Sequence, residues 1–155
     1  MKIRLADDAD LEAVHALLIE MYSEEKETLD PYLKDSSKVV DYYKKIVEER
    51  FSDEDSVVLV AEDEGKLVGF SIAYLMENEL REPSDKAYIR TIYVKKDHRN
   101  KGAGSALLEQ VVSWARDKNA GWVEADAYAA NKEGLDFWAT QGFRPLFTLI
   151  TKKLD

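Results

Sequence analysis

The stretch that decides the fold is "YVKKDHRNKGAGSALLEQVVSWA", residues 93–115. It begins at the end of a β-branched and aromatic run, passes through a basic segment with Gly102 and Gly104, and ends in an apolar pattern of helical period. The first turn of a helix has backbone N–H groups without partners inside the helix, and the helix dipole favours negative charge there. Glycine lets a ligand approach that backbone closely. The stretch therefore predicts a strand, an anion-binding loop and a helix.

Three phosphate-binding patterns compete for this loop. A P-loop ends in Gly-Lys-Ser/Thr, and no lysine follows the last glycine, Gly104. A dinucleotide fingerprint needs a third glycine where this chain has Leu107, and it should follow the first strand of its unit. The pattern Arg/Gln-x-x-Gly-x-Gly/Ala fits residues 99–104 completely. Taken alone, the glycines are equally compatible with the ordinary start of a helix.

The composition limits the classes of function. The 155 residues suit one domain, 1–155, with a buried core. A net charge of −9 argues against general nucleic-acid binding and is compatible with a cationic substrate. The chain has no cysteine and only two distant histidines, so we expect no disulfide, thiolate catalysis or metal site. No apolar run approaches the roughly 18 residues of a membrane span and no signal-peptide core is present, so we expect a cytoplasmic protein without membrane partners.

Strand patterns recur along the whole chain. Alternating or continuous apolar runs rich in β-branched residues predict strands over residues 2–6, 57–61, 67–75, 87–94, 120–128 and 143–154. Gly65 is expected to turn the hairpin between the second and third of these strands with a positive φ.

Four helices are expected between the strands. The first follows a cap at Asp7 or Asp8, the second a cap at Ser36 or Ser37, and the third the glycine loop. The fourth lies within residues 131–143. Residues 23–37 are expected to form a polar loop. The resulting order, β-α-α-β-β-β-α-β-α-β, predicts a mixed α/β domain.

Two motifs resemble those of one family. Residues 92–115 resemble the strand–loop–helix motif with which GCN5-related N-acetyltransferases (GNAT) hold the pyrophosphate of acetyl-CoA. Residues 131–143, "NKEGLDFWATQGF", resemble the family's second motif, Asn…Phe/Leu-Tyr…Gly-Phe. The element order is also similar, so the resemblance covers residues 1–155. It implies one N-acetyltransferase domain whose mixed, mostly antiparallel sheet has splayed central strands.

The resemblance implies acetyl-CoA as cosubstrate and assigns residues to it. Ile92, Tyr93 and Val94 would pair with the pantetheine arm as an added strand does. The N–H near Val94 would stabilise the oxyanion of the reaction. The other residues implied in cofactor binding are Arg99, Asn100, Lys101, Gly102, Ala103, Gly104, Ser105, Asn131 and Trp138.

Two positions depart from the family's pattern. Some members carry a Glu base on the central strand, where this chain has Arg90. A Tyr that acts as general acid often stands where this chain has Trp138, whose indole cannot transfer its proton at a useful pH. A thiol with a pKa of about 8.5 can still leave as thiolate. For Trp138, packing against cofactor or core is the simpler role.

Asp126 is the remaining candidate for the general base. Aminoglycoside 6′-N-acetyltransferases of the family have an Asp at a similar place, before the residue that matches Asn131. In the expected strand, Glu124, Asp126 and Tyr128 would share one face, so Tyr128 joins Asp126 as a candidate catalytic residue. An exposed polar strand face explains the same alternation, and both interpretations stay open.

The reaction implied is acetyl transfer to a primary amine of a polyamine- or aminoglycoside-like molecule or of a protein. Acidic residues that could attract such a cation are Glu24, Glu25, Glu27 and Asp30. A catalytically inactive, acetyl-CoA-binding regulatory module is the alternative, motivated by Arg90 and Trp138. An enzyme acting on aminoacyl-tRNA is a third possibility that the net charge disfavours. The last strand could pair with its copy in a homodimer or complete the sheet of a monomer.

Overall fold

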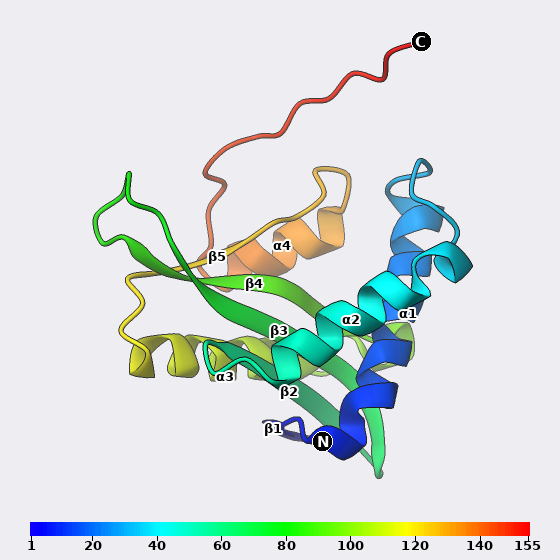
Figure 1. Ribbon diagram of the computed structural model, residues 1–155, viewed down its shortest axis with the longest axis horizontal. Coiled ribbons are helices and arrows are strands. Elements are labelled where there is room, and N and C mark those ends of the chain that lie inside the picture. The colour runs from blue at the N-terminus through cyan, green and yellow to red at the C-terminus, as the bar shows by residue number, and fades with distance from the viewer.

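The centre of the computed structural model, which describes all 155 residues, is a five-stranded sheet in the order β1-β2-β3-β4-β5 (Figure 1). Its strands are β1 (Lys2–Leu5), β2 (Ser56–Asp63), β3 (Lys66–Glu77), β4 (Asp85–Val94) and β5 (Trp122–Ala125). Neighbouring strands are antiparallel except for β4 and β5, which are parallel. The mixed, mostly antiparallel sheet predicted from the sequence is confirmed.

Four α-helices cover the sheet. They are α1 (Leu11–Thr28), α2 (Val40–Phe51), α3 (Ala103–Asp117) and α4 (Lys132–Thr140). The helices α1 and α2 lie on one face and α3 on the other, and α4 packs Phe137 and Trp138 against the same core as α3 (Figure 1). None of these helices combines the length and the apolar character that crossing a membrane requires.

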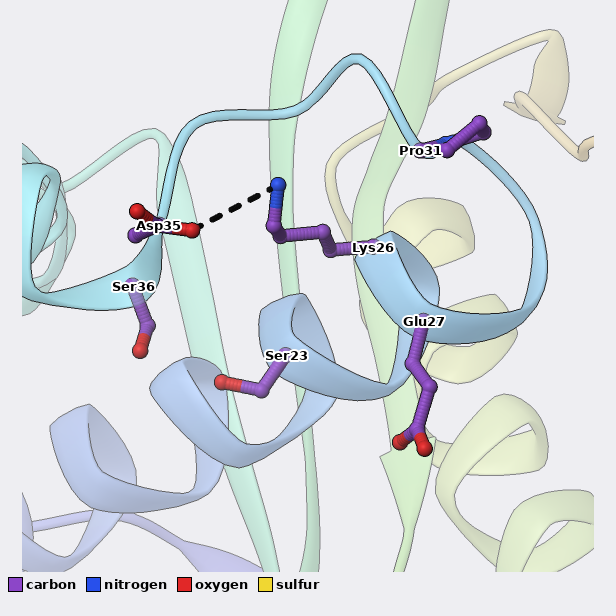
Figure 2. Close-up of a pocket in the computed structure, with 6 residues that line it drawn as sticks. All are labelled: Ser23, Lys26, Glu27, Pro31, Asp35 and Ser36. Carbon is purple, nitrogen blue, oxygen red and sulfur yellow. Dashed lines mark ion pairs between the residues drawn. The ribbon is translucent and has the colours of Figure 1, made fainter.

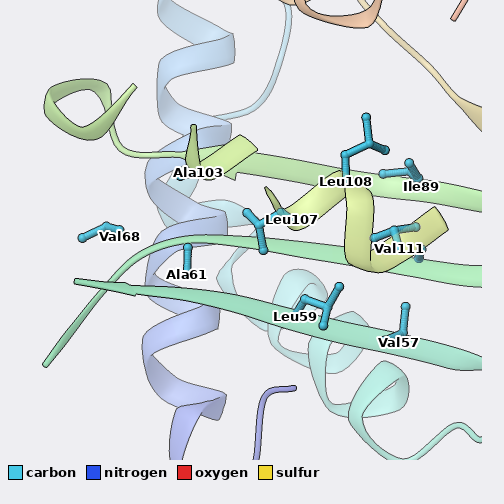
Figure 3. Packing of buried hydrophobic residues seen from close by; sticks show 10 residues of the cluster. Val57, Leu59, Ala61, Val68, Ile89, Ala103, Leu107, Leu108 and Val111 are labelled. Carbon is cyan, nitrogen blue, oxygen red and sulfur yellow. The ribbon is translucent and has the colours of Figure 1, made fainter. Parts of the chain in front are cut away.

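Two apolar cores fix the sheet between the helices. Leu107 and Val111 of α3 pack on Leu59 and Ile89 of the sheet (Figure 3). The opposite face buries Phe70 with side chains from α1 and α2. Because β3 and β4 are packed from both sides, the end of β4 is rigidly placed for whatever binds there.

The turns and helix ends follow local chemistry where the sequence signals were strong. Glu64 and Gly65, with φ of 49° and 77°, form the tight turn between β2 and β3. The side chain of Asp7 accepts a hydrogen bond from the N–H of Ala9 and caps the short turn that leads into α1. Gly142, with φ of 83°, follows the end of α4. The prediction for Gly65 is confirmed, whereas Asp7 caps the short turn before α1 and α1 itself has no side-chain cap.

The first two helices differ from the prediction. The helix α1 continues to Thr28, so the expected loop over residues 23–37 was wrong at its start. Its glutamates and lysine are strong helix formers, and the helix ends shortly before Pro31, which disfavours helical backbone at the residue before it. No serine side chain caps α2, which follows a short turn over Ser36–Lys38.

The strands β4 and β5 separate partway along their length. They pair only from Lys86 with Trp122 to Ile89 with Ala125. The expected strand over 120–128 was therefore too long, and Asp126 and Tyr128 lie in the loop beyond it. Past this point β4 continues to Val94 without β5 beside it, so the predicted splay of the central strands is present.

The expected last strand is not formed. Residues 144–155 leave α4 as an extended tail that runs away from the sheet (Figure 1). Its apolar side chains stay in solvent, with Leu149 and Ile150 86% and 88% exposed. A strand needs a neighbour for its backbone N–H and C=O groups, and the tail pairs with no strand of its own chain.

Candidate active site

The glycine loop places open backbone N–H groups at the start of α3. Asn100 and Gly102 take left-handed backbone conformations, with φ of 60° and 87°, which direct the chain sharply into the helix. The N–H of Ala106 makes a helical bond to the carbonyl of Gly102, 3.0 Å away, so the N–H groups before it are those that lack partners inside the helix. Such a helix start suits a phosphate group.

Arg99 is not free beside this loop. Its Nε donates to the carbonyl of Val94 at 2.9 Å, and its guanidinium lies 2.8 Å from a carboxylate oxygen of Glu24 on α1. The guanidinium also lies over the ring of Tyr93, 5.6 Å from its centre. Lys101 donates to the carbonyl of Asp97 at 3.0 Å but is exposed. An anion would meet the backbone and Lys101 directly and would compete with Glu24 for Arg99.

The remaining loop residues join α3 to α4. A Cβ on Gly104 would lie 3.3 Å from the ring of Phe137, so this glycine permits close helix packing as well as access to the backbone. The hydroxyl of Ser105 accepts a hydrogen bond from the side chain of Gln141 at 3.0 Å. Ala103 is buried in the core under α3.

Two residues implied in cofactor binding hold α4 in place. The side chain of Asn131 accepts a hydrogen bond from the N–H of Gly134 at 3.0 Å and caps the helix. Trp138 packs against Phe137 and Phe143, with ring centres 5.2 Å and 4.8 Å apart. This arrangement favours the packing role for Trp138.

The end of β4 presents an edge that β5 leaves uncovered. Ile92 and Val94 pack on the core under α3, whereas Tyr93 points to the opposite face. The Tyr93 hydroxyl donates to Glu20 and Glu24 at 3.1 Å and 3.2 Å. Burial, together with these two carboxylates, raises the pKa of Tyr93 and keeps the hydroxyl a donor. Tyr93 therefore connects the uncovered end of β4 to α1 through hydrogen bonds to Glu20 and Glu24.

The polar residues expected on one face of β5 have separate partners. Glu124 is held by Arg81 and by Lys86, whose Nζ lies 2.5 Å away. Asp126 accepts a hydrogen bond from the hydroxyl of Tyr88 on β4 at 2.7 Å. Burial and then Asp126 raise the pKa of Tyr88. Asp126 therefore stands at the point where β4 and β5 separate.

Tyr128 lies further along the loop and faces α1. Burial raises its pKa first, and the carboxylate of Glu25 adds to the shift. The sequence pattern places Tyr128 on β5, but its actual position in the loop brings it toward the first helix.

Glu25 was missed as an individual site residue. Burial first, and the charge of Glu24 second, raise the pKa of this carboxyl to about 7, against the opposing charge of Arg90 of β4. Tyr43 of α2 lies in the same surroundings, and burial raises its pKa to about 12. The spacing of Leu18, Tyr22 and Glu25 could have placed Glu25 on the inner face of a longer helix, but the polar composition of the segment predicts a loop.

A hollow in the surface lies outside this region. It is bounded by the end of α1 and the loop that follows (Figure 2), and its lining residues are Ser23, Lys26, Glu27, Pro31, Asp35 and Ser36. Lys26 and Asp35 form an ion pair across it at 3.6 Å. Neither β4 nor the glycine loop contributes to its walls, so it is not the place where the two motifs meet.

The family follows from the sequence as a whole. The model of the acetyltransferase (GNAT) family matches residues 11–143, and the chain belongs to this family. The chain is 30% identical over 125 residues to an uncharacterised N-acetyltransferase of Methanocaldococcus jannaschii, covering 81% of this chain and 54% of that protein. It is 28% identical over 144 residues to one of Archaeoglobus fulgidus, covering 93% of each. The chain thus spans about half the length of the first relative and most of the second.

The fold is shared with solved acetyltransferases. The structure of the aminoglycoside N-acetyltransferase AAC(6′)-Iy in complex with CoA matches 99% of each chain with a TM-score of 0.77 and 17% identity. This likeness concerns the fold. It confirms the architecture that the two sequence motifs predicted.

Proposed function

We propose that the protein transfers the acetyl group of acetyl-CoA to a primary amine of a small molecule. The observation that carries the proposal is the uncovered end of β4, which leads directly into the glycine loop and the N-terminus of α3. An extended thioester-bearing arm can pair with that strand edge, while a pyrophosphate accepts hydrogen bonds from the start of the helix.

The residues present fit this cosubstrate. Gly102 adopts a φ of 87°, and no atom lies within 4 Å of the position that a Cβ would take there, so the loop is open on that side. Lys101 supplies a cation there, and Arg99 is reached if the phosphate displaces Glu24. In this proposal Ile92, Tyr93 and Val94 bind the pantetheine arm, and the N–H of Val94 faces the developing oxyanion.

The acceptor must lose a proton before it can attack. An alkylamine like that of lysine has a pKa of about 10.4 and is mostly cationic at neutral pH. Asp126, at the point where β4 and β5 separate, is the base that the sequence suggests, and its contact with Tyr88 also suits it to bind an ammonium group. Trp138 cannot serve as an acid, so the thiol would leave as thiolate.

The acceptor class is a polyamine- or aminoglycoside-like cation. Glu25 lies within electrostatic range of Arg90 on β4, Asp126 lies just beyond the end of β5, and the chain carries a net charge of −9. A multiply charged amine is attracted by such a field. The aminoglycoside N-acetyltransferase that shares the fold supports the same class. An exposed protein amine is the second candidate acceptor.

We also propose a homodimer in which residues 144–155 of one copy pair with the sheet of the other. The tail is apolar and exposed, and β5 is an edge of the sheet. Light scattering after gel filtration should give a dimer for the full chain and a monomer for residues 1–143. A full-length monomer would contradict the dimer without affecting the proposed reaction.

The experiment that tests the reaction combines calorimetric titration with acetyl-CoA and thiol release over an amine panel. The variant is Gly102→Val, which strains the glycine loop. Gly65→Val is a matched control, because both glycines have positive φ and open surroundings but Gly65 lies in the β2–β3 turn, outside the glycine loop. We expect at least a 10-fold loss of affinity in Gly102→Val alone. Binding without turnover for any amine would instead indicate the inactive regulatory module.

A further inference from the structure

Glu25 occupies a distinct position among the acidic residues of α1. Two preceding residues on the same helix face, Leu18 and Tyr22, are 2% and 4% exposed and point into the core beside β4. Glu25 comes one turn after Tyr22, so it continues that inward face toward the open end of the sheet. It lies there half-buried, within electrostatic range of Arg90.

Arg90 marks the place on β4 where the strand becomes irregular. Ile72 of β3 pairs with Thr91, but Ala73 pairs with Ile89, so Arg90 is an extra residue in β4. It follows Ile89, the last residue of β4 that pairs with β5. Glu25 therefore faces the point where the strands separate and where the acetyl group is placed by the proposed function.

The carboxylate of Glu25, unlike those of Glu20 and Glu24, has no partner. Glu20 and Glu24 accept from the Tyr93 hydroxyl, and each also pairs with a cation, Lys95 at 3.4 Å and Arg99 at 2.8 Å. The carboxylate of Glu25 makes no hydrogen bond or ion pair within the chain, whereas its backbone carbonyl accepts from Leu29 and Asp30. A half-buried carboxylate without a partner is costly to keep and is available to a cationic ligand.

The groups that face Glu25 come from every element around it. They are Tyr22 and Glu24 of α1, Arg90 of β4, Tyr43 of α2 and Tyr128 of the loop after β5, with Asp30 beyond Tyr128. Burial raises the pKa of Tyr43 and of Tyr128, so these two hydroxyls keep their protons and add no charge near the carboxyl. Burial first, and Glu24 second, raise the pKa of Glu25 to about 7, while Arg90 lowers it. A general base is most effective when its pKa lies near the working pH.

We propose that Glu25 is the general base that takes the proton from the acceptor's ammonium group. The proposal rests on the proposed acetyl transfer. The ammonium gives one proton to the carboxylate of Glu25, which later releases it to solvent. The neutral amine then forms the C–N bond with the acetyl carbon as the C–S bond breaks. The second N–H proton goes to the thiolate, which leaves as CoA thiol.

Asp126 then has a different role. It is exposed, and one of its oxygens already accepts the Tyr88 hydroxyl at 2.7 Å. It binds another cationic group of the acceptor, or orients the amine through Tyr88, but does not take the reacting proton. Asp126→Asn should therefore raise KM for the amine and leave the pH dependence of kcat/KM in place.

The test is the pH profile of kcat/KM for an accepted amine in Glu25→Gln, with Glu12→Gln as an exposed control on the same helix. We expect kcat/KM of the parent to decrease as the pH is lowered below about 7, and we call this part of the profile the acid limb. Glu25→Gln should lose the acid limb, and its rate should be lower by about 100-fold or more. Glu25→Asp should restore part of the rate. Calorimetric affinity for acetyl-CoA should be unchanged in all three variants.

Two results would overturn the assignment. Retention of the parent's rate and acid limb by Glu25→Gln would remove Glu25 as the base while leaving acetyl transfer intact. If the parent binds acetyl-CoA but acetylates no amine, the proposed reaction fails. The carboxyl-carbon NMR titration of Glu25 then still decides its part, since a midpoint at the ordinary value of a glutamate would contradict the buried base directly.

Discussion

The two halves of the site are built differently. The half formed by the glycine loop and the start of α3 uses backbone groups that follow one another in the sequence. The half around Glu25 uses side chains from α1, α2, β4 and the loop after β5. A site made of consecutive backbone keeps its chemistry when side chains change, whereas a site assembled from four elements can be altered by any of them. The first half suits a fixed cosubstrate, and the second half suits a varied acceptor.

The largest expected effect comes from the scaffold that both halves share. Phe70 is fully buried between α1, α2 and the sheet. Phe70→Ala should lower the free energy of unfolding by about 3–5 kcal/mol, because it removes apolar burial and leaves a cavity. Urea denaturation measures the change. A loss below about 1 kcal/mol would mean that this core does not hold α1 against β4, and the placement of Glu25 would lose its basis.

A smaller effect is expected where one residue joins the two halves. Glu24 belongs to α1 but holds Arg99 of the glycine loop at 2.8 Å. Glu24→Gln removes the ion pair that Arg99 would have to break before it could bind a phosphate. Affinity for acetyl-CoA should therefore rise by about 3- to 10-fold. Calorimetric titration measures it, with Glu12→Gln as the control.

Glu24→Gln should also change the pH dependence of the reaction. Glu24 raises the pKa of Glu25, so its removal should move the acid limb of kcat/KM to lower pH. Weaker binding of acetyl-CoA by Glu24→Gln would show that Glu24 holds the loop in its binding shape, and the competition for Arg99 would be wrong.

The pH dependence of stability tests the burial of Glu25 without any substrate. Its carboxyl keeps its proton in the folded state up to about pH 7, while in the unfolded chain it ionises around its ordinary value of 4.5. The parent should therefore lose stability as pH rises between these values. Glu25→Gln lacks this loss and should be more stable by about 1 kcal/mol at pH 8, allowing for screening by solvent.

Thermal or urea unfolding at pH 4 and pH 8 measures this difference. We expect the two proteins to differ less at pH 4, where the glutamate is protonated in both states. A variant that is less stable than the parent at pH 8 would mean that Glu25 has a stabilising partner, in conflict with an unpaired base.

The smallest effect is expected from Arg90. Its positive charge lowers the pKa of Glu25. Arg90→Gln should raise that pKa and move the acid limb of kcat/KM upward by about half a pH unit, with acetyl-CoA affinity unchanged. A limb that stays in place or moves to lower pH would show that the two side chains do not act on each other.

The sequence predicted the cofactor half far better than the acceptor half. The glycine loop, the β2–β3 turn and the cap at Asp7 depend on neighbours in sequence, and their residue types report the local backbone directly. Asp126 and Tyr128 were expected on a strand because alternation continues past Ala125, although β4 had already turned away. Where a strand ends depends on its partner, which the sequence of that strand does not contain.

Two other differences between the prediction and the structure concern the length of α1 and the C-terminal tail. The sequence did not show that Glu25 lies on the inner side of a helix, because a run of charged residues resembles a loop. Such residues nevertheless form a stable helix when one side of the helix packs on the core. The apolar tail from Arg144 to Asp155 has the composition of a strand but finds no partner in its own chain. Helix propensity and packing on the core extend α1, whereas the tail would need a partner strand that its own chain does not supply.

The most direct test of the account is a crystal structure of the protein with acetyl-CoA. We predict the pyrophosphate on the backbone N–H groups at the start of α3, the pantetheine arm along the end of β4, and the thioester on the side of β4 that Glu25 faces. A pyrophosphate bound elsewhere, or a thioester remote from Glu25 and Arg90, would contradict the account of how the two halves meet.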